Sequence, residues 1–320
     1  MSVPGLPRIV LVLALAAVLA LFHLQAQAGQ KPVVATPPTM TEILANSKSS
    51  DWRPLDPENT LYLELESGRV VIELAPVFAP NHVANVKQLA REHYFDGLVV
   101  LRVQDNYVTQ WGDPNAEKPA LARKVQKASA RLPGEFDRAW DRSLPFEKLP
   151  DGDVYAREVG FSGGFPVARD PKTQRIWLAH TYGMVGAGRD VDPDSGGGTE
   201  LYAVIGQAPR HLDRNTTLLG RVVRGMELLS SLPRGTEAMG FYSAGQRKAS
   251  IRTVRVAADV PVRERSALEV LRTDTPTFRA LVESRRNRTD AWFRFRSGRV
   301  ELANVPVPVR ETPAAAGTAK

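Results

Sequence analysis

The stretch that decides the fold runs from residue 99 to residue 113 and reads VVLRVQDNYVTQWGD. Two apolar runs, 98–103 and 107–111, have the length and composition of β-strands. Arg102 interrupts the first run, which otherwise favours burial. An arginine on the solvent face of a half-exposed strand is the commoner arrangement. The second run, however, brings aromatic and amide groups close behind it, and a cation framed by such groups indicates a binding or catalytic site.

Further strand patterns flank this stretch. Residues 61–74 alternate apolar and polar side chains around a Ser-Gly turn, which predicts a β-hairpin with one buried face, and a helix is predicted from about Asn81. Residues 114–175 are polar and rich in turn residues, so we interpret them as long loops with little regular structure of their own. Additional elements are predicted as strands at 176–180, 201–205, 217–223 and 250–257 and a short helix at 225–232. Seven or eight strands with two helices favour a mainly β protein, an antiparallel barrel or sandwich with helices at its ends.

Three stretches together resemble the cyclophilin family of peptidyl-prolyl cis-trans isomerases. In the first, Arg102 and Gln110 match the arginine and glutamine of the family signature Phe-His-Arg-Val, Phe, Gln-Gly-Gly-Asp, with their spacing preserved. The other two contain His180-Thr181, Gly183, Asp192-Pro193-Asp194-Ser195, Glu200 and Tyr202, and then Leu212-Asp213, Gly220-Arg221-Val222-Val223 and Gly225-Met226. The resemblance covers residues 61–258. It implies a closed eight-stranded antiparallel barrel with a helix over each opening.

The chemistry that the resemblance implies explains an arginine in an apolar run. A peptide bond before proline resists rotation with a barrier of about 18–20 kcal/mol, because the nitrogen lone pair is delocalised into the carbonyl. Halfway through the rotation that conjugation is lost and the nitrogen becomes a hydrogen-bond acceptor. A fixed, permanently charged donor aimed at this nitrogen binds the twisted amide better than either planar isomer. No cofactor and no metal ion are expected.

The resemblance assigns Arg102 as the catalytic donor and Gln110 as the amide that steers it or binds the substrate backbone. It assigns substrate binding to nine further residues: the pocket walls Tyr107, Val108, Tyr202 and Leu212, the backbone-contact positions Gly188 and Arg189, the rim positions His211 and Thr216, and Glu200. We expect the partners to be proline-containing segments of other exported proteins.

Several residues depart from the family pattern. Tyr107 and Tyr202 replace phenylalanine, which adds hydroxyls that need partners in a buried pocket. Glu200 replaces glutamine and changes the charge. Its carboxylate either holds Arg102 rigidly or engages the donors that the prolyl nitrogen requires. We hypothesise a reduced but nonzero isomerase activity. The alternative is a cyclophilin-like module with weak catalysis that binds peptides as a chaperone or scaffold.

Residues 1–28 are predicted to be a signal peptide. Arg8 precedes an apolar run over 9–24, and the small-residue pattern Ala26-Gln27-Ala28 follows it. A membrane-spanning helix is the competing interpretation, but the run is shorter than the ~20 residues that a bilayer core requires. We therefore expect cleavage after Ala28, no stable membrane insertion afterwards, and an exported, periplasmic location.

The two ends of the mature chain are predicted to be appendages. Residues 29–60 form an N-terminal arm in which Thr39 and Glu42 have capping-box spacing. Residues 259–320 form a basic extension: a helix after Thr275, then a hairpin in which arginines alternate with aromatics over 292–296, and a disordered end. Such alternation can bind single-stranded nucleic acid, but a strand with a charged outer face fits the pattern better. Contact with an acidic envelope surface is a further alternative.

Composition excludes several other classes of protein. The chain of 320 residues has no cysteine, so disulfide scaffolds, thiolate zinc sites and cysteine nucleophiles are ruled out. Its net charge of +7 is too small to require a polyanionic partner, and no nucleic acid is expected. Asp190, Asp192 and Asp194 have the spacing of a calcium loop, but Ser195 and Leu201 stand where that loop needs glycine and glutamate.

Overall fold

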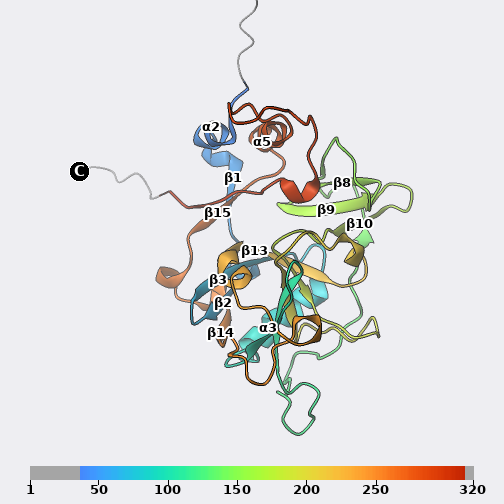
Figure 1. Ribbon diagram of the computed structural model, residues 1–320, viewed down its shortest axis with the longest axis vertical. Helices are drawn as coiled ribbons and strands as arrows, with labels where there is room; N and C mark the ends of the chain where they lie inside the picture. The colour runs from blue at the N-terminus through green and yellow to red at the C-terminus, as the bar shows by residue number, and fades with distance from the viewer. Residues whose placement is uncertain (1–36, 314–320) are drawn as a thin grey trace, which may run out of the picture. The chain divides into compact units, whose positions relative to one another are not determined.

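The computed structural model describes residues 37–313 (Figure 1). The predicted signal peptide and most of the predicted disordered end lie outside these residues. Among the described helices, none combines the length and apolar character needed to span a bilayer.

Eight antiparallel strands form the main sheet in the order β14-β2-β3-β13-β11-β12-β5-β4. This confirms the predicted eight-stranded antiparallel architecture. The strands are β2 (Thr60–Leu65), β3 (Gly68–Leu74), β4 (Val99–Val103), β5 (Val108–Gly112), β11 (Met184–Ala187), β12 (Leu201–Val204), β13 (Leu218–Arg224) and β14 (Ile251–Val256).

Hydrogen bonds between β4 and the chain that leads into β14 nearly close this sheet into a barrel. The amide of Val100 donates to the Ala249 carbonyl over 2.9 Å, and the Tyr242 amide donates to the Leu101 carbonyl over 3.1 Å. A bridge also joins Arg102 to Phe241. The closure places the irregular segment before β14 directly beside Arg102.

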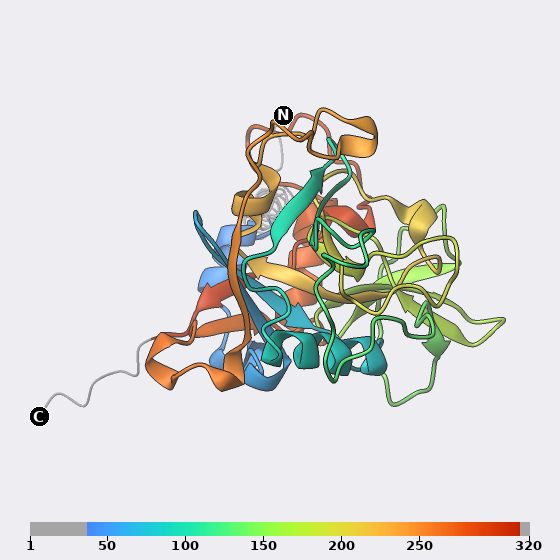
Figure 2. The same ribbon diagram turned by 90° about the horizontal axis from the view of Figure 1, so that it is seen from below.

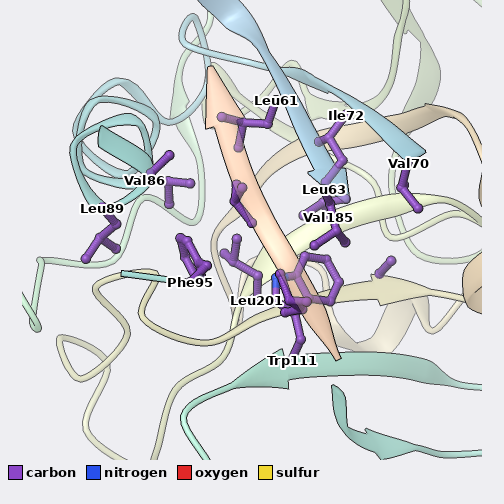
Figure 3. Packing of buried hydrophobic residues seen from close by; sticks show 14 of the residues in the cluster. Leu61, Leu63, Val70, Ile72, Val86, Leu89, Phe95, Trp111, Val185 and Leu201 are labelled. Carbon is purple, nitrogen blue, oxygen red and sulfur yellow. The ribbon is translucent and has the colours of Figure 1, made fainter. Parts of the chain in front are cut away.

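Helix α3 (Pro80–Arg91) begins with proline at its first turn, where the missing amide proton costs least. Its apolar stripe packs into the same core cluster as the inward faces of the barrel strands. Figure 3 shows Val86 and Leu89 of this helix directed toward the cluster that contains Leu61, Leu201 and Trp111. The second predicted helix is the short α4 (Met226–Ser230), which buries Leu229.

A second sheet shows that the prediction of loops over 114–175 is wrong for its later part. Its order is β6-β10-β9-β8-β7. The strands are β6 (Arg138–Ala139), β7 (Glu147–Lys148), β8 (Glu158–Ser162), β9 (Phe165–Asp170) and β10 (Arg175–Leu178). Gly163 and Gly164 do form a turn, since they have positive φ values of 58° and 93°. The turn does not belong to a long loop, because it joins β8 to β9 as a hairpin. In Figure 2 these yellow-green strands lie to one side of the barrel strands.

The strand predicted at 176–180 therefore belongs to the second sheet, and the barrel takes β11 from residues 183–198, a stretch rich in glycine. Glycine weakens a strand pattern in sequence, which hides β11. At Gly186 a Cβ atom would lie 2.4 Å from the hydroxyl oxygen of Tyr202, so the neighbouring strand requires glycine there.

A third sheet joins the two predicted appendages, with β15 (Leu268–Leu271) between β1 (Trp52–Pro54) and β16 (Val309–Glu311). The predicted capping box begins α2 (Met40–Ala45), which lies beside α5 (Pro276–Arg286) (Figure 1). The helix prediction after Thr275 is confirmed. The predicted hairpin is wrong, because residues 287–308 contain no strand. The described 3-10 turns are Ser49–Asp51, Pro57–Asn59, Arg210–Leu212, Ala238–Gly240, Ala257–Asp259, Val262–Glu264 and Leu302–Asn304.

Candidate active site

A cleft of about 820 Å³ opens on the barrel over β4, β5 and β12. Ten of the predicted site residues line it: Arg102, Tyr107, Val108, Gln110, Gly188, Arg189, Glu200, Tyr202, Leu212 and Thr216. His211 is the exception, because it lines a neighbouring hollow with Arg210 and Asp213. The 3-10 turn at Arg210–Leu212 separates the two, with Leu212 on the cleft and His211 on the other hollow.

Strand pairing brings Arg102 and Gln110 together. The register of β4 against β5 shifts between Val100 and Arg102, and beyond this bulge Arg102 is paired with Gln110. A bulge of this kind re-aims a side chain on a strand. The same residues on an uninterrupted ladder would fall out of register with each other.

The Arg102 side chain is buried but incompletely satisfied, with 7% of the residue exposed. Nη2 donates to Oε1 of Gln104 over 2.5 Å, and Nη1 makes a longer 3.4 Å bond to Oε1 of Gln110. Nε has no hydrogen-bond partner among the described residues. The rings of Tyr107 and Phe241 each lie 5.4 Å from the guanidinium carbon. Burial lowers the pKa of Arg102, although a guanidinium remains charged at any physiological pH.

Gln110 connects Arg102 to Glu200. Its Nε2 donates to Oε2 of Glu200 over 2.6 Å, so its amide oxygen is left to face the guanidinium. Burial raises the pKa of Glu200, and the nearby carboxylates of Asp190 and Glu117 raise it further. The hydrogen bond from Gln110 acts in the opposite direction and lowers this pKa. The carboxylate therefore acts on the arginine through the amide between them, an arrangement that neither sequence-based alternative anticipates.

Two glycines make room for this chain of side chains. A Cβ atom at Gly112 would lie 2.6 Å from Cγ of Glu200. A Cβ atom at Gly188 would lie 3.2 Å from Nε2 of Gln110 and 3.3 Å from Cβ of Glu200. Larger residues at either position would displace the amide or the carboxylate, so these glycines contribute to the geometry of the cleft.

The hydroxyl of Tyr202 has the partners that a buried pocket demands. It lies 2.6 Å from Oγ1 of Thr216 and 3.0 Å from Nε2 of His180. Nδ1 of His180 lies 3.1 Å from a carboxylate oxygen of Asp213, whose other oxygen accepts a 2.6 Å bond from Nε of Arg210. Burial lowers the pKa of His180, against the opposing effect of Asp213. A neutral His180 that donates from Nδ1 can accept the Tyr202 proton at Nε2, which fixes the ring orientation.

Several residues of the cleft are not predicted from the sequence. Gln104 holds the guanidinium, and Met239, Phe241 and Tyr242 line the cleft from the segment that closes the barrel. The resemblance includes His180 and Asp213 but assigns them no role. The only signal for Gln104 is its position two residues after Arg102, directly beyond the end of β4, whereas the closing segment has no periodic pattern at all.

The comparisons with known proteins agree on one family. Residues 60–256 match the model for the cyclophilin type peptidyl-prolyl cis-trans isomerase/CLD family. A probable peptidyl-prolyl cis-trans isomerase of Brucella suis is 30% identical over 186 residues, which are 57% of this chain and 76% of that protein. Peptidyl-prolyl cis-trans isomerase B of Bacillus subtilis is 26% identical over 177 residues, which are 55% of this chain and 92% of that protein.

A solved structure extends the likeness beyond the barrel. The cyclophilin AquaCyp293 from Hirschia baltica superposes with a TM-score of 0.65 and 25% identity, and the match covers 85% of this chain and 97% of that one. Because the family model covers only residues 60–256, this structure also shares elements outside the barrel.

Proposed function

Since this chain belongs to the cyclophilin family and is a peptidyl-prolyl cis-trans isomerase, we propose that Arg102 is the group that stabilises the twisted amide. The observation that carries the proposal is a buried guanidinium on the wall of the cleft whose donors are not all satisfied. Gln104 and Gln110 hold it in place. Donors that are fixed beforehand need no reorganisation when the prolyl nitrogen becomes an acceptor.

The neighbouring side chains have distinct roles in this proposal. The pocket walls that hold the proline ring are Tyr107, Val108, Tyr202 and Leu212, and the hydrogen bond between the hydroxyls of Tyr202 and Thr216 keeps the wall rigid. Gln110 turns its amide oxygen toward Arg102, and Glu200 fixes that orientation. The carboxylate also places negative charge near the reacting nitrogen, which is why we propose a reduced but nonzero rate.

The test is the isomerisation rate of an Ala-Pro peptide with wild-type protein and with Arg102→Ala. Loss of a donor that acts mainly in the transition state should lower kcat/KM about 100-fold, while the affinity for the peptide changes far less. Arg247→Ala, at an exposed arginine outside the cleft, serves as the control. Background rates for both the wild type and Arg102→Ala, with peptide binding retained, would support the peptide-binding module instead.

We further propose that the protein is exported and assists the folding of other exported proteins, whose X-Pro bonds would be its substrates. The support is the sequence of residues 1–28. N-terminal sequencing of the protein from fractionated cells should find Gly29 as the first residue in the periplasmic fraction. Recovery of the chain in the cytosol with residues 1–28 still attached would contradict export.

A further inference from the structure

Two large aromatic side chains between α5 and the 3-10 turn at Leu302–Asn304 are exposed to solvent. Trp292 is 81% exposed and Phe295 is 82% exposed. Single exposed apolar residues are common on protein surfaces, but two such rings within four residues form a patch. The segment that carries them, residues 288–299, contains no strand, so no sheet partner accounts for the alternating pattern.

The segment is ordered by local contacts that leave the patch facing outward. The rings of Trp292 and Phe293 pack edge to face with centroids 4.9 Å apart, and the guanidinium of Arg288 lies 4.8 Å from the Phe293 ring. At the far end, the amide of Gly298 donates to the Arg286 carbonyl over 3.1 Å. The segment is therefore a loop tied at its base to the end of α5.

The charges of the segment are mostly uncompensated cations. Arg288, Arg294 and Arg296 form no ion pair with any of residues 37–313. The adjoining carboxylates of Asp151 and Glu283 are bound to Arg286, and the segment itself contains a single carboxylate, at Asp290. Exposed aromatic rings are thus flanked by arginines that are free to meet anions.

We propose that residues 288–299 bind the surface of an anionic phospholipid bilayer. Trp292 and Phe295 would enter the headgroup region, where tryptophan is enriched in membrane proteins, while Arg294 and Arg296 contact lipid phosphates. The geometry argues against two other occupants. Phe293 is covered by Trp292 and Arg288, so successive bases have no row of open rings on which to stack. A second copy would bring like-charged arginines together.

The test is co-sedimentation of the full chain with vesicles of phosphatidylcholine mixed with phosphatidylglycerol, and with vesicles of phosphatidylcholine alone. Each arginine near an anionic surface contributes roughly fivefold in partitioning. Arg294→Ser with Arg296→Ser should therefore lower binding to the anionic vesicles by about 25-fold, and added salt should remove the difference. Arg247→Ser with Arg263→Ser removes the same charge from side chains that are 89% and 85% exposed and should have little effect.

A second readout separates this segment from the apolar run at residues 9–24, which is present in every variant. Lipids brominated along their acyl chains quench an indole only when it enters the bilayer. The fluorescence difference between wild type and Trp292→Phe should be quenched in anionic vesicles, with prolyl isomerase activity unchanged. An unquenched Trp292, or equal loss of binding in the two double-arginine variants, would overturn the proposal. The proposal would also be overturned if Arg294→Ser with Arg296→Ser left vesicle binding unchanged and instead abolished binding to a single-stranded oligonucleotide, or abolished self-association in sedimentation.

Discussion

Replacing Glu200 with glutamine should raise the isomerisation rate. The contacts of 2.6 Å and 3.4 Å on the two sides of Gln110, with ~2.3 Å between its amide atoms, place the carboxylate within about 8 Å of the guanidinium. Two unit charges at that distance interact by about 2 kcal/mol at an effective dielectric constant of 20. If the twisted prolyl nitrogen lies beside the guanidinium, at a similar distance from the carboxylate, and carries roughly a third of a negative charge, the carboxylate opposes its formation by about 0.7 kcal/mol. Removing that charge should increase kcat/KM about threefold.

The assay is two-dimensional NMR exchange on an Ala-Pro peptide, because it needs no coupling protease and can be used at any pH. Burial raises the pKa of Glu200. Acidification through that pKa should therefore remove the charge and raise the wild-type rate, whereas the Glu200→Gln rate should stay level. Glu66→Gln serves as the control, since it removes an exposed carboxylate that lies outside the cleft. A Glu200→Gln rate equal to or below the wild-type rate would show that the carboxylate charge does not oppose formation of the twisted amide.

Three further predictions concern stability and are checked by urea unfolding. Tyr202→Phe removes the buried hydroxyl that binds Nε2 of His180 and should lower the free energy of unfolding by about 1 kcal/mol. An unchanged free energy of unfolding would mean that this hydrogen bond contributes nothing to stability. Arg221→Met leaves Arg53, which is more exposed, as the ion-pair partner of the buried Glu73 carboxylate, and should lower the free energy of unfolding by about 3 kcal/mol. An unchanged urea midpoint would contradict this prediction. Asp153→Asn removes one of two charges around buried Arg210 and should cost about 2 kcal/mol, whereas Asp141→Asn, on the surface, should cost almost nothing.

Local patterns predict the barrel where apolar alternation is long. The hairpin of β2 and β3, the helix α3 and the strands around Arg102 are all visible in sequence, because each has a regular apolar pattern. The prediction that the hairpin has only one buried face is wrong, because Tyr62 and Val71 on its other face pack in a second cluster with Leu268. The pattern does not predict β11, where contact with the Tyr202 ring demands glycine at position 186. It does not predict the second sheet either, since β6 and β7 are two-residue strands held by partners distant in sequence.

The residues of the site also fall into those that the sequence predicts and those that it does not. Arg102, Gln110 and most pocket walls can be assigned, because a resemblance carries residues at fixed spacings along single strands. Gln104 binds the guanidinium from just beyond the end of β4, and Phe241 lies beside it because the closing segment bridges to Arg102. Spacing along the sequence reveals neither contact. His211 is misplaced because the direction of a side chain in a one-turn 3-10 segment depends on the whole loop.

The second sheet is part of the machinery that shapes the proline pocket. Its residues Phe165 and Ile176 share a core cluster with Val108 and Tyr202 of the cleft. The indole of Trp177 donates to Asp213 over 3.3 Å, and Asp153 binds Arg210, which itself binds Asp213. Asp213 in turn orients His180 against Tyr202. A buried polar network is stable only when each member is satisfied, so the barrel cannot hold the Tyr202 hydroxyl in this way without the residues that the added sheet supplies.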